Sequence, residues 1–307
     1  MEIHLKEILE IPEKAEICYS HTKNLVLPFR VPYLGMGSSY YAALTLKYNG
    51  FAVQPDIASE YFNYLVPNKK SPLGVLISQS GRSSETLWCR ELFDRYVAIT
   101  NYDDSPLTES AHIEKKILLM AGPEEGSSTK TYINTLIALY NGCGMDTRPA
   151  VNMLKSHLSF YEAWGRETAD RLYNLLQKNP LRGFYIIANG PNIPTAYHAS
   201  IILAESTKLP FQAMAVSQYD HGPKETADGS FVIAIHTNGP AHERTAKLVK
   251  KISDAGAETV ILDQTNIQEK FSPITASISL SFFMHFLSEK LGIEKTFVVG
   301  SKITQQE

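Results

Sequence analysis

Val75-Leu-Ile-Ser-Gln-Ser-Gly-Arg-Ser-Ser-Glu-Thr86 is the stretch that decides the expected fold of this chain. Its apolar start is typical of a buried strand, and a helical pattern of Leu87, Glu91 and Leu92 follows its serine-rich loop. Hydroxyls and a glycine between a strand and a helix predict a phosphate cradle, because the first N–H groups of a helix bind anions. A serine-rich helix cap without a ligand is the alternative.

Composition and charge limit what else the chain can bind. Its 307 residues are enough for two domains, and 44% hydrophobic and 20% charged residues are typical of a globular protein. With 29 basic against 32 acidic side chains, it has no broad attraction for nucleic acid or an anionic membrane, so phosphate must be bound locally. We see no apolar run of membrane-spanning length and no signal peptide, and we expect a cytoplasmic protein.

The spacing of cysteines and histidines predicts neither a disulfide nor a metal site. Cys18, Cys89 and Cys143 lack any paired spacing, which favours reduced and buried thiols. The nine histidines form no array typical of metal ligands. We therefore expect no metal and no cofactor.

Strands and helices alternate along the first half of the chain. Short apolar runs separated by helical patterns predict five strands, at residues 31–34, 52–57, 75–77, 96–100 and 116–120. Strands joined through helices form a parallel sheet, so we expect an α/β fold. A lead-in helix over residues 1–20, interrupted at Pro12, precedes this sheet, and a helix that begins with the hydroxyls around Ser128 follows it.

The second half repeats the plan of the first. Strand patterns followed by glycine loops recur at Gly190 and Gly239, matching those at Gly37 and Gly81. We therefore predict two flavodoxin-like, doubly wound parallel sheets, in a first domain over residues 1–148 and a second over 181–307. Long helical patterns over residues 149–180 predict a helical linker between them.

The two copies differ where a ligand would bind. The second copy has His236-Thr-Asn-Gly-Pro-Ala-His242 in place of the serine loop, and its proline removes a donor N–H. We therefore expect one phosphate site, in the first half. In the second half, Glu205 near a helix end and His221 before Gly-Pro are residue types suited to moving protons on a sugar. A solvated helix face and a turn are the alternatives for these two residues.

The chain resembles the tandem SIS-domain sugar-phosphate isomerases, most closely the isomerase half of glucosamine-6-phosphate synthase. The resemblance covers nearly the whole chain. The matching motifs are Gly37-Ser-Ser39, Ile57-Ala-Ser-Glu60, Ser78-Gln-Ser-Gly81 with Ser83, Ser128-Thr-Lys130, Glu205, His221-Gly-Pro223 and Lys302-Ile-Thr.

The resemblance implies a role for each matching residue in a homodimer that binds a hexose 6-phosphate or amino-hexose 6-phosphate. Glu205 would move a proton between C1 and C2, His221 from the partner subunit would assist ring opening, and Lys302 in the C-terminal tail would close over the open-chain sugar. The residues implied to hold the sugar and its phosphate are Gly37, Ser38, Ser39, Ser78, Gln79, Ser80, Ser83 and Ser128.

Two departures from the synthase leave the reaction open. The glutaminase half has no counterpart in this sequence, and Ile202 stands where the synthase usually has lysine. The expected activity is that of an aldose–ketose isomerase or an amino-sugar-phosphate deaminase acting on substrates such as glucosamine 6-phosphate or fructose 6-phosphate. A fructosamine-6-phosphate deglycase, a sugar-phosphate sensor without catalysis and an inactive structural subunit are the alternatives.

Overall fold

The structure, a computed structural model, describes residues 2–65, 70–178, 180–300 and 304, and the chain divides into two compact units. Unit 1 consists of Met1–Ile11, Glu125–Thr129 and Pro149–Val298, and unit 2 of Pro12–Glu124, Lys130–Arg148 and Val299–Glu307. Each unit is therefore assembled from segments that are distant in the sequence.

Unit 2 is built on a five-stranded parallel sheet. Its strands are β1 (Pro32–Gly35), β2 (Gln54–Ile57), β3 (Ser71–Ile77), β4 (Phe93–Thr100) and β5 (Ile113–Leu118). The order β2-β1-β3-β4-β5 is the flavodoxin order, which confirms the predicted α/β class with a parallel sheet. Each strand lies within a few residues of its predicted position.

Helices cover the sheet of unit 2 because its strands are apolar on both faces. The helix α2 (Ile11–Thr22) precedes the first strand, and the helices between and after the strands are α3 (Gly37–Tyr48), α4 (Ala58–Glu60), α5 (Ser84–Trp88) and α6 (Lys130–Gly142). One face packs Leu34, Leu76 and Ala98 into a cluster with residues of α4 and α5. The helix after the serine loop is shorter than predicted, since a 3₁₀ turn at Cys89–Leu92 follows α5.

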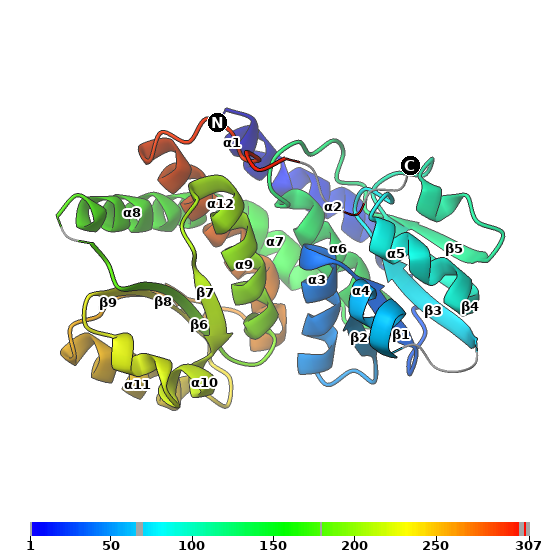
Figure 1. Cartoon of the computed structure of the whole chain (residues 1–307). Coiled ribbons are helices and arrows are strands. Elements are labelled where there is room, and N and C mark those ends of the chain that lie inside the picture. The colour runs from blue at the N-terminus through cyan, green and yellow to red at the C-terminus, as the bar shows by residue number, and fades with distance from the viewer. Residues whose placement is uncertain (1, 66–69, 179, 301–303, 305–307) are drawn as a thin grey trace. The chain divides into compact units, whose positions relative to one another are not determined.

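Unit 1 contains a four-stranded parallel sheet in the order β7-β6-β8-β9. Its strands are β6 (Gly183–Ala188), β7 (Gln212–Ala215), β8 (Ser230–His236) and β9 (Glu258–Asp263). Its helices are α1 (Glu2–Leu9), α7 (Arg148–Ser156), α8 (Leu158–Leu176), α9 (Asn192–Thr207), α10 (Val216–Asp220), α11 (His242–Asp254) and α12 (Ser272–Lys290). In Figure 1, α10 and α11 lie on one side of this sheet, and α8 and α12 lie on the other.

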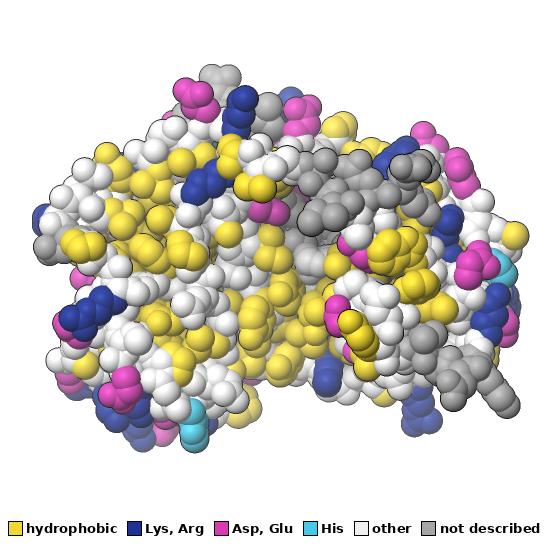
Figure 2. Space-filling model, viewed as in Figure 1, with side chains coloured by type: hydrophobic (Ala, Val, Ile, Leu, Met, Phe, Trp, Pro, Cys, Tyr) yellow, Lys and Arg dark blue, Asp and Glu magenta, His cyan; other side chains and the backbone are white. Residues whose placement is uncertain are grey.

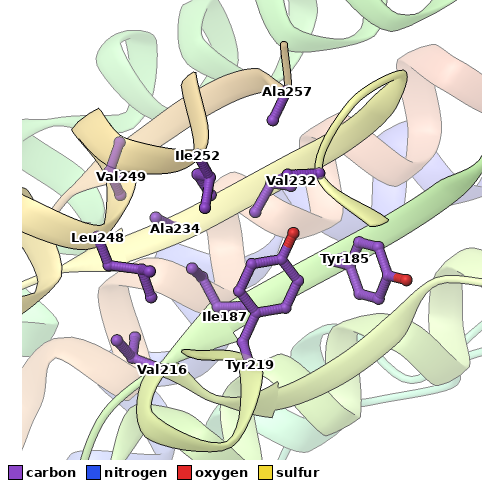
Figure 3. Packing of buried hydrophobic residues seen from close by; sticks show 11 residues of the cluster. Tyr185, Ile187, Val216, Tyr219, Val232, Ala234, Leu248, Val249, Ile252 and Ala257 are labelled. Atoms are coloured by element: carbon purple, nitrogen blue, oxygen red, sulfur yellow. The ribbon is translucent and has the colours of Figure 1, made fainter. Parts of the chain in front are cut away.

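The core beneath α10 and α11 shows how the strand pattern produces this layering. Tyr219 of α10 and Leu248 and Ile252 of α11 pack against Val232 of β8 and Ile187 of β6 (Figure 3). All of these side chains are buried. Burial of side chains of this size stabilises the fold by about 1.5–3 kcal/mol each.

Residues 149–180, predicted as a linker, instead form helices that pack within unit 1. Gly165 of α8 lies against α12 so closely that a Cβ built on it would be 2.5 Å from Cβ of Phe282 and 2.7 Å from the backbone N of Phe283. Only a glycine permits this approach of two helices. The described part of this segment is therefore an integral layer of unit 1.

The segment Glu269–Lys290, which includes α12, is long and apolar enough to span a membrane by length and composition. The sequence had led us to expect no apolar run of membrane-spanning length, so this segment differs from that expectation. Its apolar window is 100% buried within the protein, which is typical of the core helix of a globular domain.

The N-terminal helix pattern also differs from its prediction. The turn at Glu10 divides it into α1 and α2, and Pro12 lies in the first turn of α2, where a missing N–H costs nothing. Except for residue 11, α1 and α2 fall in different units. The helix expected from Ser128 begins at Lys130.

The three cysteines are free and buried, as expected from their spacing. Burial raises the pKa of each thiol to about 12, so all three remain protonated. On the face shown in Figure 2, acidic and basic side chains are interspersed without an extended surface of one sign. This agrees with a net charge of −3 and with anion binding at a local site.

Candidate functional site

The sheet of unit 2 places two loops side by side at its carboxyl edge. Strands β1 and β3 are neighbours, and their last residues, Gly35 and Ile77, are paired in the register. The strand order reverses at this point, and such a switch point is where open α/β sheets bind ligands. The loops that carry Gly37–Ser39 and Ser78–Ser83 therefore start next to each other, as the candidate phosphate site requires.

The first loop turns directly from β1 into α3. Gly37 has φ +48°, a left-handed conformation that suits glycine, and the backbone N–H of Ser39 donates to the carbonyl of Met36 at 3.0 Å. Ser38 and Ser39 lie in the first turn of α3 and are half-buried. Their hydroxyls are thus located at the start of a 12-residue helix, where its dipole favours an anion.

The second loop is held by its own serines. Ser78 is buried, and its Oγ donates to Oγ of Ser83 at 3.2 Å. The backbone N–H of Arg82 donates to Oγ of Ser80 at 3.2 Å. Because Ser80 and Ser83 accept in these bonds, each hydroxyl retains its own proton for donation to a ligand. This supplies neutral donors in a half-buried turn.

The backbone of the same loop is anchored to β4. The carbonyl of Gln79 accepts from the backbone N–H of Asn101 at 2.9 Å and from Oγ1 of Thr100 at 3.2 Å. The Gln79 side chain is half-buried and belongs to the rim of the loop. A rigid backbone with adaptable side-chain donors is suited to binding an anion.

Gly81 is the residue of this loop least able to change. Its φ is +64°, and a Cβ built on it would lie 2.0 Å from Oγ of Ser105. We expect Gly81→Ala to destabilise unit 2 by about 2–4 kcal/mol, which combines backbone strain with a steric clash, and to weaken phosphate-ester binding. Urea unfolding and calorimetric titration would measure the two effects.

Gly50→Ala is the matched control for Gly81→Ala. Gly50 has φ +82°, but nothing lies within 4 Å of a Cβ built on it. Gly50→Ala should lower the free energy of unfolding by about 1–2 kcal/mol through backbone strain and leave the affinity for the phosphate ester unchanged. Equal losses of stability and affinity in the two variants would show that the position of Gly81 in the loop is unimportant.

One described residue of the C-terminal segment contacts α5. The hydroxyl of Ser84 donates to the carbonyl of Thr304 at 3.2 Å, and Oγ1 of Thr304 donates to Oε1 of Glu85 at 2.5 Å. Thr304 ends the Lys302-Ile-Thr motif, but its contact was not predicted from the sequence, because the two bonded residues are 220 positions apart. Lys302, the predicted tail residue, lies outside the described residues.

In unit 1, the predicted residues Ser128 and Glu205 are carried by two segments that pack together. Ser127 and Ser206 are both buried, and their hydroxyls are 2.9 Å apart in a hydrogen bond. Their chain neighbours Ser128 and Glu205 are half-buried. The short segment 125–129 is therefore joined to the carboxyl end of α9 near the candidate carboxylate.

The helix end at Glu205 is closed by Lys208, which has φ 63°. Its Nζ donates to the backbone carbonyls of Glu205 and of Thr296. Ile202, one turn earlier, is fully buried in the core. The carboxylate is thus carried on a well-anchored helix end, next to an apolar turn.

A polar cavity of about 150 Å³ lies at this end of α9. Its lining consists of His4, Glu125, Gly126, Ser206, Ser288, Ile293, Glu294 and Thr296. Nε2 of His4 is 3.1 Å from Oγ1 of Thr296, and burial lowers the pKa of His4 to about 4. At neutral pH the cavity therefore presents an uncharged imidazole and hydroxyls, with two exposed carboxylates at its edge.

His221 does not lie near Glu205 within unit 1. It follows α10 and is exposed, at the carboxyl edge of the sheet just beyond β7. Glu205 lies at the far end of α9, a 16-residue helix about 24 Å long that starts at that same edge (Figure 1). The two residues therefore cannot reach one sugar carbon skeleton from within a single copy of unit 1.

The class of this protein follows from its fold and its loops. The chain is an α/β protein with parallel sheets in flavodoxin-type strand order and with a serine–glycine loop at a switch point.

Solved structures with this fold include the C-terminal domain of glucosamine-fructose-6-phosphate aminotransferase from Francisella tularensis, with a TM-score of 0.75 and 18% identity over 95% of this chain and 97% of that chain. Glucosamine-6-phosphate deaminase from Thermotoga maritima gives a TM-score of 0.72 at 17% identity, covering 94% of this chain and 95% of that one. Tagatose-6-phosphate ketose/aldose isomerase from Escherichia coli gives 0.74 at 14%, covering 99% and 97%.

Sequence comparison points to one kind of relative. Glutamine–fructose-6-phosphate aminotransferase (isomerizing) of Methanothermobacter thermautotrophicus is 26% identical over 295 residues, covering 86% of this chain and 49% of the relative. The Thermus thermophilus protein of the same name is 28% identical over 261 residues, covering 76% and 42%. No protein-family model matches the chain. The chain spans about half the length of these relatives, and the predicted resemblance to their isomerase half is confirmed.

Proposed function

We propose that this chain is an enzyme of the phosphosugar isomerase kind that acts on a hexose 6-phosphate or an amino-hexose 6-phosphate. We propose further that it consists of two tandem SIS domains, one in each unit. The similarity to aminotransferases, deaminases and isomerases that are named for hexose phosphates supports the class of substrate.

The observation that carries this proposal is the serine–glycine loop at the switch point of unit 2. Gly81 permits a turn that no other residue would adopt without strain, and the hydroxyls of Ser80 and Ser83 can each donate to an anion. Ser38, Ser39, Ser78 and Gln79 lie in the same pair of adjoining loops. A phosphate ester is the ligand for which such neutral donors and helix starts are suited.

We assign the proton transfer to Glu205. A carboxylate removes the proton from C2 of an open-chain aldose, the electron pair forms an enediol, and the same acid returns the proton to C1 to give the ketose. With an amino group at C2, the same shift yields an imine, which water hydrolyses to the ketose and ammonia. Ser128, joined through Ser127 to the end of α9, is assigned to the sugar hydroxyls.

We assign ring opening to His221 supplied by a partner subunit of a homodimer. Support comes from the separation of Glu205 and His221 within unit 1, since a second copy can provide an imidazole that the same copy cannot. Lys302 is proposed to close over the open-chain sugar. No cofactor is proposed, and the compartment proposed is the cytoplasm.

A substrate panel in deuterated water tests the proposal. The purified chain would be incubated separately with glucosamine 6-phosphate, fructose 6-phosphate with ammonia, and a fructosamine 6-phosphate. Mass spectrometry should then detect product, or deuterium at C1 or C2, for at least one of these compounds. Release of an amine from fructosamine 6-phosphate alone would indicate a deglycase. Tight binding of a sugar phosphate with neither product nor exchange would indicate a sensor and defeat the enzymatic proposal.

A further inference from the structure

The sheet of unit 1 has its own switch point, formed in the same way as that of unit 2. Its order β7-β6-β8-β9 corresponds to β2-β1-β3-β4, and β6 and β8 are paired neighbours. Loops with Gly190 and Gly239 follow these two strands. Gly190 has φ +50°, close to the +48° of Gly37, and the N–H of Asn192 donates to the carbonyl of Asn189 at 3.0 Å, as Ser39 does to Met36. The first of the two loops is thus reproduced in detail.

A carboxylate from the same unit fills this second switch point. Oγ1 of Thr237 donates to Oε1 of Glu269 at 2.6 Å. A Cβ built on Gly239 would lie 2.0–2.1 Å from the carboxyl atoms of Glu269, and one built on Gly190 would lie 3.9–4.0 Å from them. The Glu269 carboxylate therefore lies directly against the Gly239 loop and within contact of the Gly190 loop.

Glu269 is held in this position by the start of α9. Its carbonyl accepts from Oγ of Ser272 at 2.7 Å, and Ser272 accepts from Nδ2 of Asn192 at 2.6 Å. Asn192 and Ser272 are fully buried, and Asn192 is the first residue of α9. The backbone of Glu269 is consequently anchored to the start of α9, and the bond from Thr237 holds its carboxylate against the loop pair.

The switch point of unit 2 differs in charge at the matching glycine. The nearest atoms to a Cβ on Gly81 belong to Ser105 and Thr100, whose side chains are uncharged. Two unit charges 4 Å apart repel by about 1 kcal/mol in water and by about 4 kcal/mol near a protein surface. A fixed carboxylate would therefore exclude a phosphate from the loops of unit 1, whereas the loops of unit 2 lack this obstacle at Gly81.

We propose that Glu269 acts as an internal anionic ligand of unit 1, occupying a cradle that would otherwise bind a phosphate ester through its remaining donors, since Pro240 removes only one N–H. Its charge confines phosphate binding to unit 2 and gives the chain a single site. This inference adds to the proposed function only the number of phosphate sites. Whether the Glu269 carboxylate occupies the unit 1 cradle does not depend on which ligand unit 2 binds.

The test counts the sites for glucosamine 6-phosphate and for inorganic phosphate by calorimetry and ³¹P NMR. Glu269→Gln removes the charge and retains an oxygen to accept from Thr237, and Glu269→Ala also opens space. Each of these two variants should bind one more anion per chain than the wild type does. Its association constant at the unit 1 loops should be at least about tenfold higher than that of the wild type at the same loops. The matched control is Glu167→Gln on α8, an exposed residue of unit 1 on a helix that does not start at this loop pair, which should add no site.

The outcomes separate the inference from the proposed function. If the wild type binds no phosphate ester but Glu269→Gln binds one, the proposed function fails and the internal ligand stands. If the wild type binds one and both Glu269 variants also bind one, with native circular dichroism, the inference is overturned. Should Glu269→Ala fail to fold, Glu269→Gln alone decides, since it preserves the hydrogen-bond acceptor.

Discussion

Replacement of Glu205 by glutamine should lower kcat by about 10²–10⁴-fold and change sugar-phosphate affinity little. The reason is that an amide of the same shape cannot accept the C2 proton, whereas the phosphate donors of unit 2 are untouched. Steady-state kinetics on the active compound of the panel would give kcat, and calorimetric titration would give the dissociation constant.

A matched variant distinguishes loss of chemistry from loss of charge. Glu167→Gln on the exposed side of α8 removes the same charge from unit 1 and should leave both kcat and affinity unchanged. Loss of deuterium exchange at C2 in Glu205→Gln alone would place Glu205 in the proton transfer. Full turnover by this variant would remove Glu205 from the mechanism.

Acidification should destabilise unit 1 because of histidines buried in the neutral form. Burial lowers the pKa of His198 to about 3 and that of His4 to about 4, from 6.5 in an unfolded chain, and it also lowers the pKa of His285. Between pH 6.5 and pH 4 the unfolded state therefore binds more protons than the folded state. The free energy of unfolding should fall as the pH decreases through this range, with a limiting slope of about 1.4 kcal/mol per pH unit for each of His198 and His4 once the pH is well below 6.5.

Urea unfolding between pH 7 and pH 5 measures this slope. A Trp88→Phe background leaves Trp164, which donates to the carbonyl of Ile261, as the fluorescent reporter of unit 1. His198→Gln should reduce the average slope between pH 7 and pH 5 by about 1 kcal/mol per pH unit, and His285→Gln should reduce it in the same direction if His198→Gln does not fold. The exposed His21→Gln is the control. A stability independent of pH across this range would contradict the prediction.

Local patterns were sufficient to predict the parallel sheets and the position of the serine–glycine loop. Apolar runs of three to six residues alternating with helical patterns predicted the strands of the first sheet, and the serines with Gly81 marked the loop, because these signals depend on neighbouring residues. The register between β1 and β3 then places Ser38 and Ser39 beside Ser78. That step depends on the strand order, which pairs Gly35 with Ile77 across the sheet.

Contacts between distant segments were not predictable in the same way. Residues 125–129 join unit 1 through Ser127 and Ser206, which are 79 positions apart. Residues 149–180 form a packed layer and not a linker, because Gly165 allows α8 to approach α12. His4 and Thr296, which line the cavity, belong to segments at opposite ends of the chain. No short window of sequence contains such pairs.

Sequence by itself determined the α/β class, the repeated strand–loop–helix plan and the residues of the serine loop, since each depends on local propensity and periodicity. Tertiary structure alone decided which segments make up unit 1, where the polar cavity lies, and which carboxylate fills the second switch point. The physical reason is that burial and hydrogen bonding stabilise contacts between groups that are distant in the sequence and that only the packed chain brings together. Glu269 lies 30 residues beyond Gly239, and its charge lies against that loop because β9 runs parallel to β8 and ends at the same edge of the sheet.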